Sequence, residues 1–195
     1  MWFFELKARK KGYTYIAGID EAGRGALAGP VISAAVILLS DFSCYGITDS
    51  KKLTPLKRKK LFSIIMDNAF GVSIGIADHG EIDKINILQA SLKSMKRAVL
   101  GLNYSPDFLL IDGKFLIDSH LPQQAIIKGD SKSVSIAAAS IIAKVTRDSI
   151  MEKMHLKFPE YGFNKHKGYP TKAHKEAIIR FGACIEHRKS FKGVK

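Results

Sequence analysis

Residues 15–25 read Tyr-Ile-Ala-Gly-Ile-Asp-Glu-Ala-Gly-Arg-Gly, and Ala-Gly-Pro at 28–30 and an apolar run follow them. The aromatic and β-branched residues from 13 to 19 predict a first strand. Two adjacent carboxylates, Asp20 and Glu21, come next, and then a glycine-flanked arginine, where the backbone can bend sharply and approach a ligand closely. Acids beside a basic turn suggest a site where a metal ion meets a phosphate. Solvated acids in an ordinary α/β turn fit these eleven residues equally well.

Strand-like and helical segments alternate along the rest of the chain. The run at 31–39 is apolar enough for a strand buried on both faces, and Thr54 followed by Pro55 fits the start of a helix. This order predicts one α/β domain over residues 1–195, with a core at about 13–182, a mixed sheet flanked by helices, and C-terminal helices. The other expected strands are 72–77, 108–112 and a segment from 124 that ends at Asp130. The other expected helices are 78–100, 131–158 and 171–181, with an exposed lead-in at 1–12 and a loose tail at 188–195.

The charge of the chain is unusual for a soluble domain. Its 31 Lys and Arg against 18 Asp and Glu give a net charge of +13 and a pI of about 9.7. The part from 144 to 195 carries thirteen basic and five acidic residues, and 51–60 carries six basic residues and no acid. Positive potential concentrates phosphates, so a polyanionic partner is favoured over a basic surface that serves only solubility.

Cysteine usage and hydropathy predict a cytoplasmic protein. Cys44 and Cys184 are far apart and match neither a redox motif nor a zinc spacing. Isolated cysteines in a lysine-rich chain indicate free thiols in a reducing compartment. The first residues lack the length and cleavage site of a signal peptide. No run approaches the ~20 apolar residues of a membrane span. Nothing in the sequence calls for more than one copy of the chain, so we expect a monomer.

Carboxylates follow three separate apolar segments: Asp20 with Glu21, Asp112 and Asp130. Ligand sites of open α/β sheets lie outside strand ends, where neighbouring strands bring such residues together. Carboxylates collected at one place repel one another unless a cation lies among them. An all-oxygen ligand set indicates Mg²⁺ or Mn²⁺ rather than zinc, and two such ions could clamp the attacking and leaving oxygens of a phosphodiester. The alternative is that each Asp only opens a turn.

Glu21 raises a geometric difficulty, because neighbouring side chains of a strand point to opposite faces. Asp20 and Glu21 reach one site only if the chain turns at Glu21, or if Glu21 contributes its backbone carbonyl.

Several long blocks, in this order, closely resemble bacterial ribonuclease HII. They are IDEAGRG with AGPV from residue 19, DSKKL from 49, IDG from 111, KGD from 128, AAASIIAKVTRD from 137 and HKGYPT from 166. The resemblance covers about residues 13–182. It implies a ribonuclease H-like fold and endonucleolytic cleavage of RNA in RNA–DNA hybrids. It also implies incision at single ribonucleotides in duplex DNA, with Mn²⁺ or Mg²⁺ as cofactor and 5′-phosphate and 3′-hydroxyl products.

The resemblance also implies roles for individual residues. The four family acids fall on Asp20, Glu21, Asp112 and Asp130. The segment Gly23-Arg24-Gly25 would contact the ribonucleotide 2′-hydroxyl, largely through its backbone. Tyr169 would stack at the ribose of the RNA–DNA junction. The residues agree, because only the 2′-hydroxyl distinguishes RNA from DNA at a site, and a glycine-flanked backbone can approach a sugar.

Further candidates are less specific. Ser50 and Lys51 precede a helix N-terminus, where phosphate contacts are expected, although a solvated basic turn is the alternative. Asp148 could assist metal binding, but a structural pair with Arg or Lys is the favoured interpretation. His166 could reach a substrate phosphate.

Three hypotheses follow. The leading one is a metal-dependent endoribonuclease on RNA–DNA hybrids. A non-catalytic nucleic-acid-binding domain would explain the charge but not the acids. A metal nuclease of the same fold acting on another substrate, such as DNA junctions, would not explain the Gly-Arg-Gly and His-Lys-Gly-Tyr segments.

Overall fold

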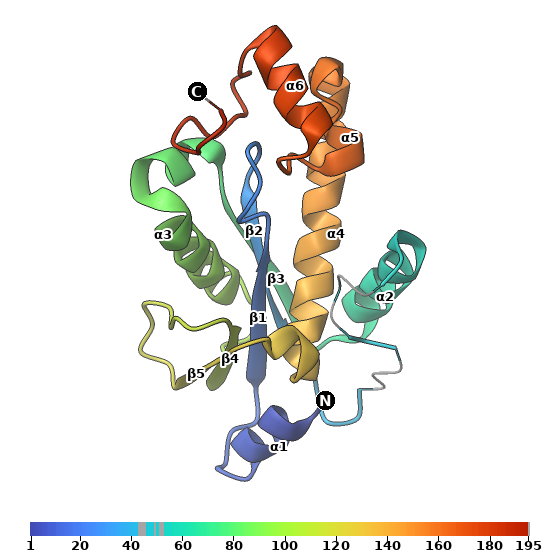
Figure 1. Ribbon diagram of the computed structural model, residues 1–195. Helices are drawn as coiled ribbons and strands as arrows, with labels where there is room; N and C mark the ends of the chain where they lie inside the picture. The colour runs from blue at the N-terminus through green and yellow to red at the C-terminus, as the bar shows by residue number, and fades with distance from the viewer. Residues whose placement is uncertain (43–45, 49, 51–52, 195) are drawn as a thin grey trace.

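Five strands form one mixed sheet in the computed structural model, which describes residues 1–42, 46–48, 50 and 53–194. The spatial order is β3-β2-β1-β4-β5 (Figure 1). The central strand β1 is antiparallel to β2 and parallel to β4, β2 is antiparallel to β3, and β4 is parallel to β5. The strands are β1 (Ile16–Ala22), β2 (Val31–Ile37), β3 (Gly71–Ala77), β4 (Phe108–Asp112) and β5 (Gln123–Ile126). The predicted mixed sheet is therefore confirmed.

Helices cover both faces of this sheet. α4 (Val134–Lys157) runs along one face of β1 with α2 (Pro55–Asn68) beside it, and α3 (His79–Leu100) covers the other face (Figure 1). Close approach of α4 depends on Gly18, because a Cβ there would lie 2.1 Å from the carbonyl carbon of Ser135. The buried alanines 137–139 complete this contact. The helix in which the basic C-terminal part begins, at Lys144, is thus fixed against the central strand.

Helix boundaries follow capping residues in the sequence. Thr54 accepts a hydrogen bond from the N–H of Lys57, and Pro55 is the first helical residue, as predicted. Ser133 and Thr171 cap α4 and α6 (Lys172–Phe181) in the same way. None of the helices in the described ranges is both long and apolar enough to span a lipid bilayer.

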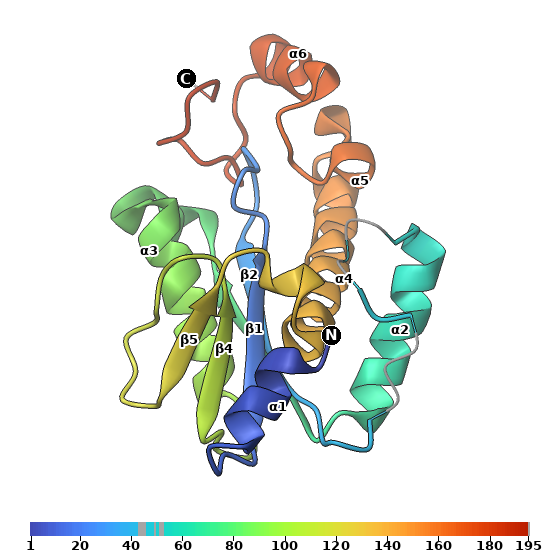
Figure 2. The same cartoon turned by 60° about the horizontal axis from the view of Figure 1, so that its bottom comes forward.

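Both ends of the chain differ from expectation. The lead-in contains a helix, α1 (Phe3–Arg9), which lies by the starts of β1 and α4 (Figure 2). Its buried Glu5 accepts hydrogen bonds from the Ser133 hydroxyl and the Ser135 N–H, at 2.5 and 3.0 Å. The expected loose tail is wrong for residues 188–194. Arg188 is fully buried, and Asp83 accepts hydrogen bonds from the N–H groups of Lys189 and Ser190, at 2.9 Å each.

Candidate active site

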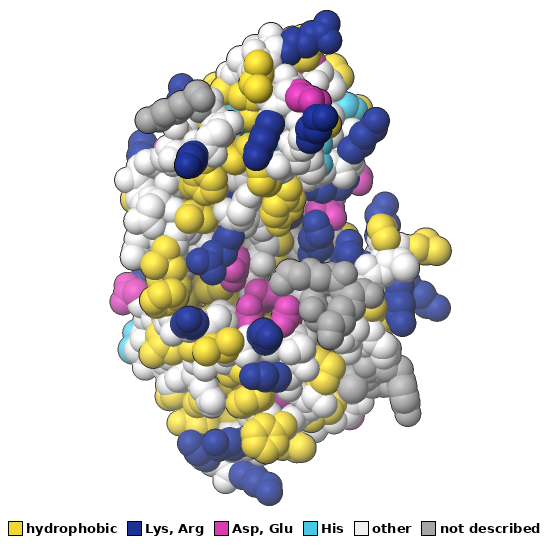
Figure 3. All heavy atoms as spheres, in the orientation of Figure 1, with side chains coloured by type: hydrophobic (Ala, Val, Ile, Leu, Met, Phe, Trp, Pro, Cys, Tyr) yellow, Lys and Arg dark blue, Asp and Glu magenta, His cyan; other side chains and the backbone are white. Residues whose placement is uncertain are grey.

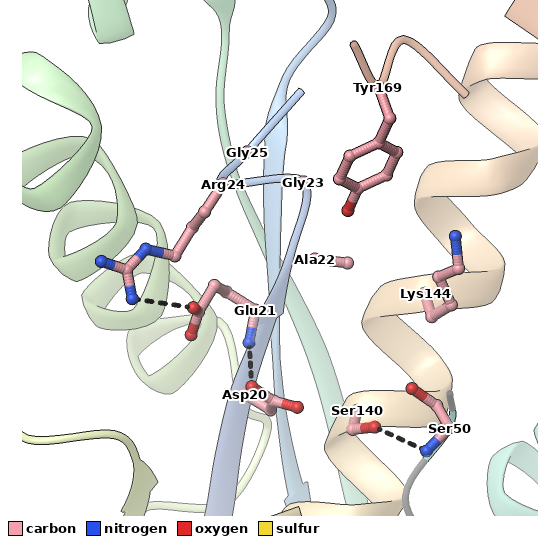
Figure 4. A pocket seen from close by; sticks show the side chains of 10 residues that line it. All are labelled: Asp20, Glu21, Ala22, Gly23, Arg24, Gly25, Ser50, Ser140, Lys144 and Tyr169. Atoms are coloured by element: carbon pink, nitrogen blue, oxygen red, sulfur yellow. Dashed lines mark hydrogen bonds and ion pairs between the residues drawn. The ribbon is translucent and has the colours of Figure 1, made fainter. Parts of the chain in front are cut away.

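A cleft of about 420 Å³ opens at the carboxyl end of β1 (Figure 4). Its walls come from β1 and the loop after it, from the segment before α2, from α4, and from the segment between α5 (Phe163–His166) and α6. The lining residues are Asp20, Glu21, Ala22, Gly23, Arg24, Gly25, Ser50, Ser140, Lys144 and Tyr169. The fold therefore gathers seven of the predicted site residues. Lys51 lies outside the described residues.

Asp20 marks the meeting point of the four predicted carboxylates. Its side chain is buried, and its pKa is raised well above the usual value by burial first, then by repulsion from Glu21 and Asp112 and, more weakly, from Asp130. The register explains part of this proximity. Ile19 of β1 pairs with Ile111 of β4, and the two strands are parallel, so Asp20, two residues before the end of β1, and Asp112, the last residue of β4, lie on neighbouring strands. Acids distant in sequence thus share one electrostatic neighbourhood.

Asp130 reaches this neighbourhood differently from the prediction. β5 ends at Ile126, and Asp130 lies in a short 3₁₀ turn, Gly129–Ser131, after Lys128 in the left-handed conformation (φ 56°). Asp112 holds this turn, because its Oδ1 accepts a hydrogen bond from the Gly129 N–H at 2.6 Å. The expected strand end is therefore wrong for Asp130, although the expected proximity to the other acids is found.

Glu21 belongs to the strand rather than to the turn. β1 continues to Ala22, and Glu21 pairs with Ser33 of β2, so the chain does not turn at Glu21. Its Oε1 lies 3.3 Å from Nη1 of Arg24. The sharp bend comes at Gly23, whose φ is +103°. Of the two routes by which Glu21 could reach a shared metal site with Asp20, the turn at Glu21 is wrong.

The carboxylates are suited to hard divalent cations whose coordination shell is completed by water and by the substrate. Among the described ranges, no group of three or more His, Cys, Asp or Glu side chains forms a ready-made metal cage. Mg²⁺ usually binds through one or two carboxylates, several waters and substrate phosphates rather than in an all-protein cage. The donors around the buried Asp20 are all oxygens, which matches this mode of binding. The neighbouring acids disfavour the ionised form of Asp20, and a bound cation would relieve that repulsion.

Tyr169 stands across the cleft from the acids and directs its hydroxyl into it (Figure 4). Two cations flank the ring: Nζ of Lys144 lies 5.8 Å, and the guanidinium carbon of Arg147 5.4 Å, from the ring centroid. Cations at such distances are attracted by the face of an aromatic ring. The ring is thereby held at the edge of the site.

Asp148 and His166 do not line the cleft, and both have structural partners. Asp148 accepts a hydrogen bond from Nζ of Lys144 at 2.7 Å and lies 3.8 Å from Nη1 of Arg58, which matches the favoured interpretation of a structural pair. Nδ1 of His166 accepts from the Gly168 N–H, at 3.2 Å, so its Nε2 donates to the Tyr161 carbonyl, at 2.8 Å. Both ring nitrogens of His166 therefore hold the loop before Tyr169.

Some residues at or behind the cleft were missed by sequence reasoning. Ser140, Lys144 and Arg147 lie four and then three residues apart on α4, so their helical spacing could have placed them on one face. Arg188 gave no such signal, because its side-chain contacts lie 159 to 165 residues earlier in the chain.

The surface around the cleft combines both charges. Figure 3 shows a small patch of acidic side chains near the middle of this face, with Lys and Arg side chains above and below it. The basic side chains would attract the phosphates of a polyanion, and bound cations would be needed only beside the acids, where the reacting phosphate would lie.

Comparisons with known proteins identify the family of this chain. The family model described as Ribonuclease HII matches residues 17–194. The curated Ribonuclease HII of Acetivibrio thermocellus is 58% identical over 191 residues, which covers 98% of this chain and 75% of that protein. The ribonuclease H2 structure from Pyrococcus horikoshii OT3 superposes with a TM-score of 0.77 at 28% identity, over 92% of this chain and 94% of that one.

A more distant structure supports the fold alone. Bst-RNase HIII in complex with Mn²⁺ superposes with a TM-score of 0.72 at 20% identity, over 97% of this chain and 70% of that one.

Ribonucleases H depend on divalent metal ions and hydrolyse RNA in RNA–DNA hybrids, so the alternative of a non-catalytic binding domain is wrong. With the ribonuclease H-like sheet, the matching family model and relatives that span nearly all of its length, the chain belongs to the ribonuclease HII family.

Proposed function

We propose that this ribonuclease H hydrolyses the RNA strand of hybrids and also incises duplex DNA at single embedded ribonucleotides. The single observation that carries the proposal is the cleft that Asp20 and Glu21 share with the Gly23–Gly25 loop and Tyr169, while Asp112 and Asp130 lie near enough to Asp20 to raise its pKa. Acids alone would serve any metal nuclease. A glycine-flanked backbone and an aromatic ring across from them supply a means to recognise a ribose.

We assign the metal-holding role to Asp20, Glu21, Asp112 and Asp130, and two Mn²⁺ or Mg²⁺ ions as cofactor. Such ions lower the pKa of the attacking water and stabilise the departing oxygen. Because the side chains of Asp20 and Glu21 leave an extended strand on opposite faces, we expect Glu21 to contribute its backbone carbonyl. The hydrogen bond from Gly129 to Asp112 holds that carboxylate in place before any ion binds.

The reaction is a hydrolysis at the phosphate on the 5′ side of the ribonucleotide. A water oxygen bonds to phosphorus and loses a proton, and the bond from phosphorus to the 3′-oxygen breaks. The 3′-oxygen takes up a proton, which leaves a 3′-hydroxyl and a 5′-phosphate.

We assign substrate contacts to the groups opposite the acids. Backbone groups of Gly23, Arg24 and Gly25 would meet the 2′-hydroxyl, and the Tyr169 ring would stack on the sugar. Ser50 is buried at the cleft wall, where its N–H donates to Oγ of Ser140 at 3.4 Å and its carbonyl accepts from Nε of Arg58 at 3.0 Å. A residue held in this way can present a fixed surface to a substrate phosphate, and Lys51 remains a predicted partner in that contact.

One assay tests the proposal. The protein is incubated with Mn²⁺ or Mg²⁺ and labelled duplexes that carry a single ribonucleotide, an RNA tract, or DNA only, beside a DNA junction. We expect cleavage 5′ of the single ribonucleotide and within the RNA tract. Cleavage of the tract without cleavage of the single site would contradict embedded-ribonucleotide incision. Cleavage of the junction would favour the other nuclease hypothesis.

We further propose that the enzyme acts as a monomeric single domain in the cytoplasm. The five strands form one continuous sheet, and the free thiol of Cys184 fits a reducing compartment. Light scattering at working concentration tests the first point. A dimeric mass would contradict it.

A further inference from the structure

Arg188 is a fully buried arginine that binds the loop after β1, residues 23–30. Its Nη2 donates to the carbonyl of Gly23 at 2.8 Å, its Nη1 to that of Arg24 at 2.9 Å, and its Nε to that of Gly29 at 3.0 Å. Every nitrogen of the guanidinium thus holds a backbone carbonyl of one short segment. A fork of fixed geometry makes such a contact, and an ammonium group cannot reproduce it.

Arg147 is buried as completely and holds the other end of the same segment. Its Nε donates to the carbonyl of Pro30 at 3.0 Å, and its Nη2 to that of Ala28 at 3.1 Å. Its Nη1 donates at 2.9 Å to the carbonyl of Lys167, two residues before Tyr169. Arg147 therefore connects the two loops that face the substrate.

Gly23 lies directly against this guanidinium. A Cβ at residue 23 would stand 2.1 Å from Nε of Arg147, and the φ of +103° is one that side chains rarely adopt. The glycine is needed here for contact with Arg147 as well as for the bend.

Holding these carbonyls also fixes the amides that follow them. In a trans peptide the C=O and N–H point in opposite directions, so the bonds from Arg188 to Gly23 and Arg24 direct the N–H groups of Arg24 and Gly25 away from the guanidinium. Both residues are exposed and line the cleft. Within the described part of the chain, neither N–H has a protein acceptor. Two amides are thus oriented and available to a ligand oxygen.

The two guanidinium groups have like charges and lie close together. The pKa of Arg188 falls to about 9, through burial first and then repulsion from Arg147, and burial also lowers the pKa of Arg147. Burying like charges opposes folding, and apolar residues of similar volume often serve stability better. A role in shaping the site accounts for a pair that stability alone does not favour.

We propose that Arg147 and Arg188 are positioning residues for ribose recognition, which orient the Arg24 and Gly25 amides and the Tyr169 loop toward a sugar 2′-hydroxyl. The inference rests on the proposed role of this loop in substrate recognition.

The test compares R188K and R147K with R97K as the matched control. Arg97 also donates to a backbone carbonyl, that of Ile76, at 2.5 Å, but it lies on α3 and its other partner is Glu81. Each variant is assayed for cleavage of the single-ribonucleotide duplex, for Mn²⁺ activation, and for binding of that duplex relative to all-DNA duplex in Ca²⁺. Amide exchange of Arg24 and Gly25 is measured in parallel.

We expect R188K and R147K to lower kcat/KM by about 100-fold, as misplacement by about 1 Å can. Their preference for the ribonucleotide duplex should shrink and the two amides should exchange faster, while the Mn²⁺ midpoint stays the same. R97K should match the wild type in all four measurements. An unchanged binding preference or unchanged exchange in the arginine variants overturns the inference.

Two further outcomes separate this inference from the proposed function. If wild-type enzyme does not cleave the single-ribonucleotide duplex, the proposed function fails, whereas the amide exchange still reports on the two arginines. If neither variant folds, relaxation measurements on the wild type decide. The Arg24 and Gly25 amides should then be as rigid as those of β1, and fast disorder at these residues overturns the inference.

Discussion

The carboxylate of Asp112 accepts a hydrogen bond from the Gly129 N–H at 2.6 Å, and this bond ties the end of β4 to the turn that carries Asp130. Two acids that are eighteen positions apart in the chain are thereby fixed relative to each other. The bond uses an oxygen that an asparagine side chain also has, so the charge of Asp112 can be removed while the contact is kept.

Asp112→Asn should therefore retain the fold and hybrid binding but lose turnover. We expect a loss well beyond about 100-fold, since even groups that only orient metal ligands contribute about 10- to 100-fold. Initial rates in Mn²⁺ and Mg²⁺, with thermal melts and hybrid titrations, check this. Asp118→Asn is the control, because Asp118 pairs with Lys96 at the surface, outside the cleft. Loss of folding in Asp112→Asn would instead make Asp112 a structural acid.

Asp20→Asn should stabilise the metal-free protein. Repulsion from neighbouring acids would be relieved, and the hydrogen bond from the Glu21 N–H to Oδ1, at 2.7 Å, can persist. We expect a gain of about 1 kcal/mol in the free energy of unfolding, the scale of one pKa unit. Urea unfolding in EDTA measures it. Added Mn²⁺ should stabilise the wild type and not the variant; a less stable variant would contradict the proposed repulsion.

Asp148→Asn should affect stability and leave metal activation unchanged. Its partners are Lys144 at 2.7 Å and Arg58 at 3.8 Å, and partly exposed pairs of this kind contribute about 1 kcal/mol or less. The matched control is Glu176→Gln, which removes an exposed pair of the same spacing with Lys172. A shifted Mn²⁺ midpoint in Asp148→Asn alone would return Asp148 to the metal site.

Tyr169→Ala should impair cleavage at the RNA–DNA junction more than overall affinity. Aromatic stacking on nucleic acid contributes about 1–3 kcal/mol, so we expect a fall of about 10- to 100-fold in kcat/KM. Tyr169→Phe keeps the ring between Lys144 and Arg147 and should retain most of the activity. Tyr104→Ala, which removes an exposed ring packed on Phe70, controls for surface effects. Equal losses of affinity and cleavage would contradict the assigned role.

The buried His174 should make the protein less stable in acid. Its Nδ1 donates to the Tyr169 carbonyl at 2.9 Å, so its Nε2 accepts from Nε2 of His187 at 3.1 Å, and both rings must be neutral. Burial lowers the pKa of His174 from 6.5 to about 4. Between these values the unfolded chain binds the proton that the folded chain excludes, so stability rises with pH in that window. The slope from this group is at most about 1.4 kcal/mol per pH unit.

Urea unfolding from pH 4 to 7 measures this slope, and His174→Gln, which cannot titrate, should reduce it. An identical pH dependence in the two proteins would show that His174 is not the group responsible.

Local sequence predicted the segments whose signals are local. Thr54 and Pro55 located the start of α2, and the apolar run after Pro30 located β2, because capping and burial on both faces leave direct traces in composition. The first strand begins and ends about three residues later than its composition predicts. Its aromatic start favoured Tyr13, whereas pairing of Glu21 and Ala22 with Ser33 and Ile32 of β2 extends the real strand to Ala22.

The site was predicted as far as acids and glycines reveal it. What the sequence could not provide was the 3₁₀ turn at Asp130, which follows from the bond to Asp112, and the role of Arg188. In the sequence, an arginine in a polar tail looks the same whether it is buried or exposed to solvent. Only the path of the chain around Leu27, whose carbonyl accepts from the Arg188 N–H at 2.8 Å, places it in the interior.

The bond between Arg188 and Gly23 also has a consequence for how the enzyme is made. A ribosome produces the loop at 23–30 early, but the side chain that holds three of its carbonyls arrives 159 to 165 residues later. Contacts between residues so far apart in the chain are slow to form, because closing a long loop costs entropy. The sheet can thus assemble on a growing chain before the loop is fixed. A nascent polypeptide that stops short of residue 188 would present the acids without the means to choose a substrate.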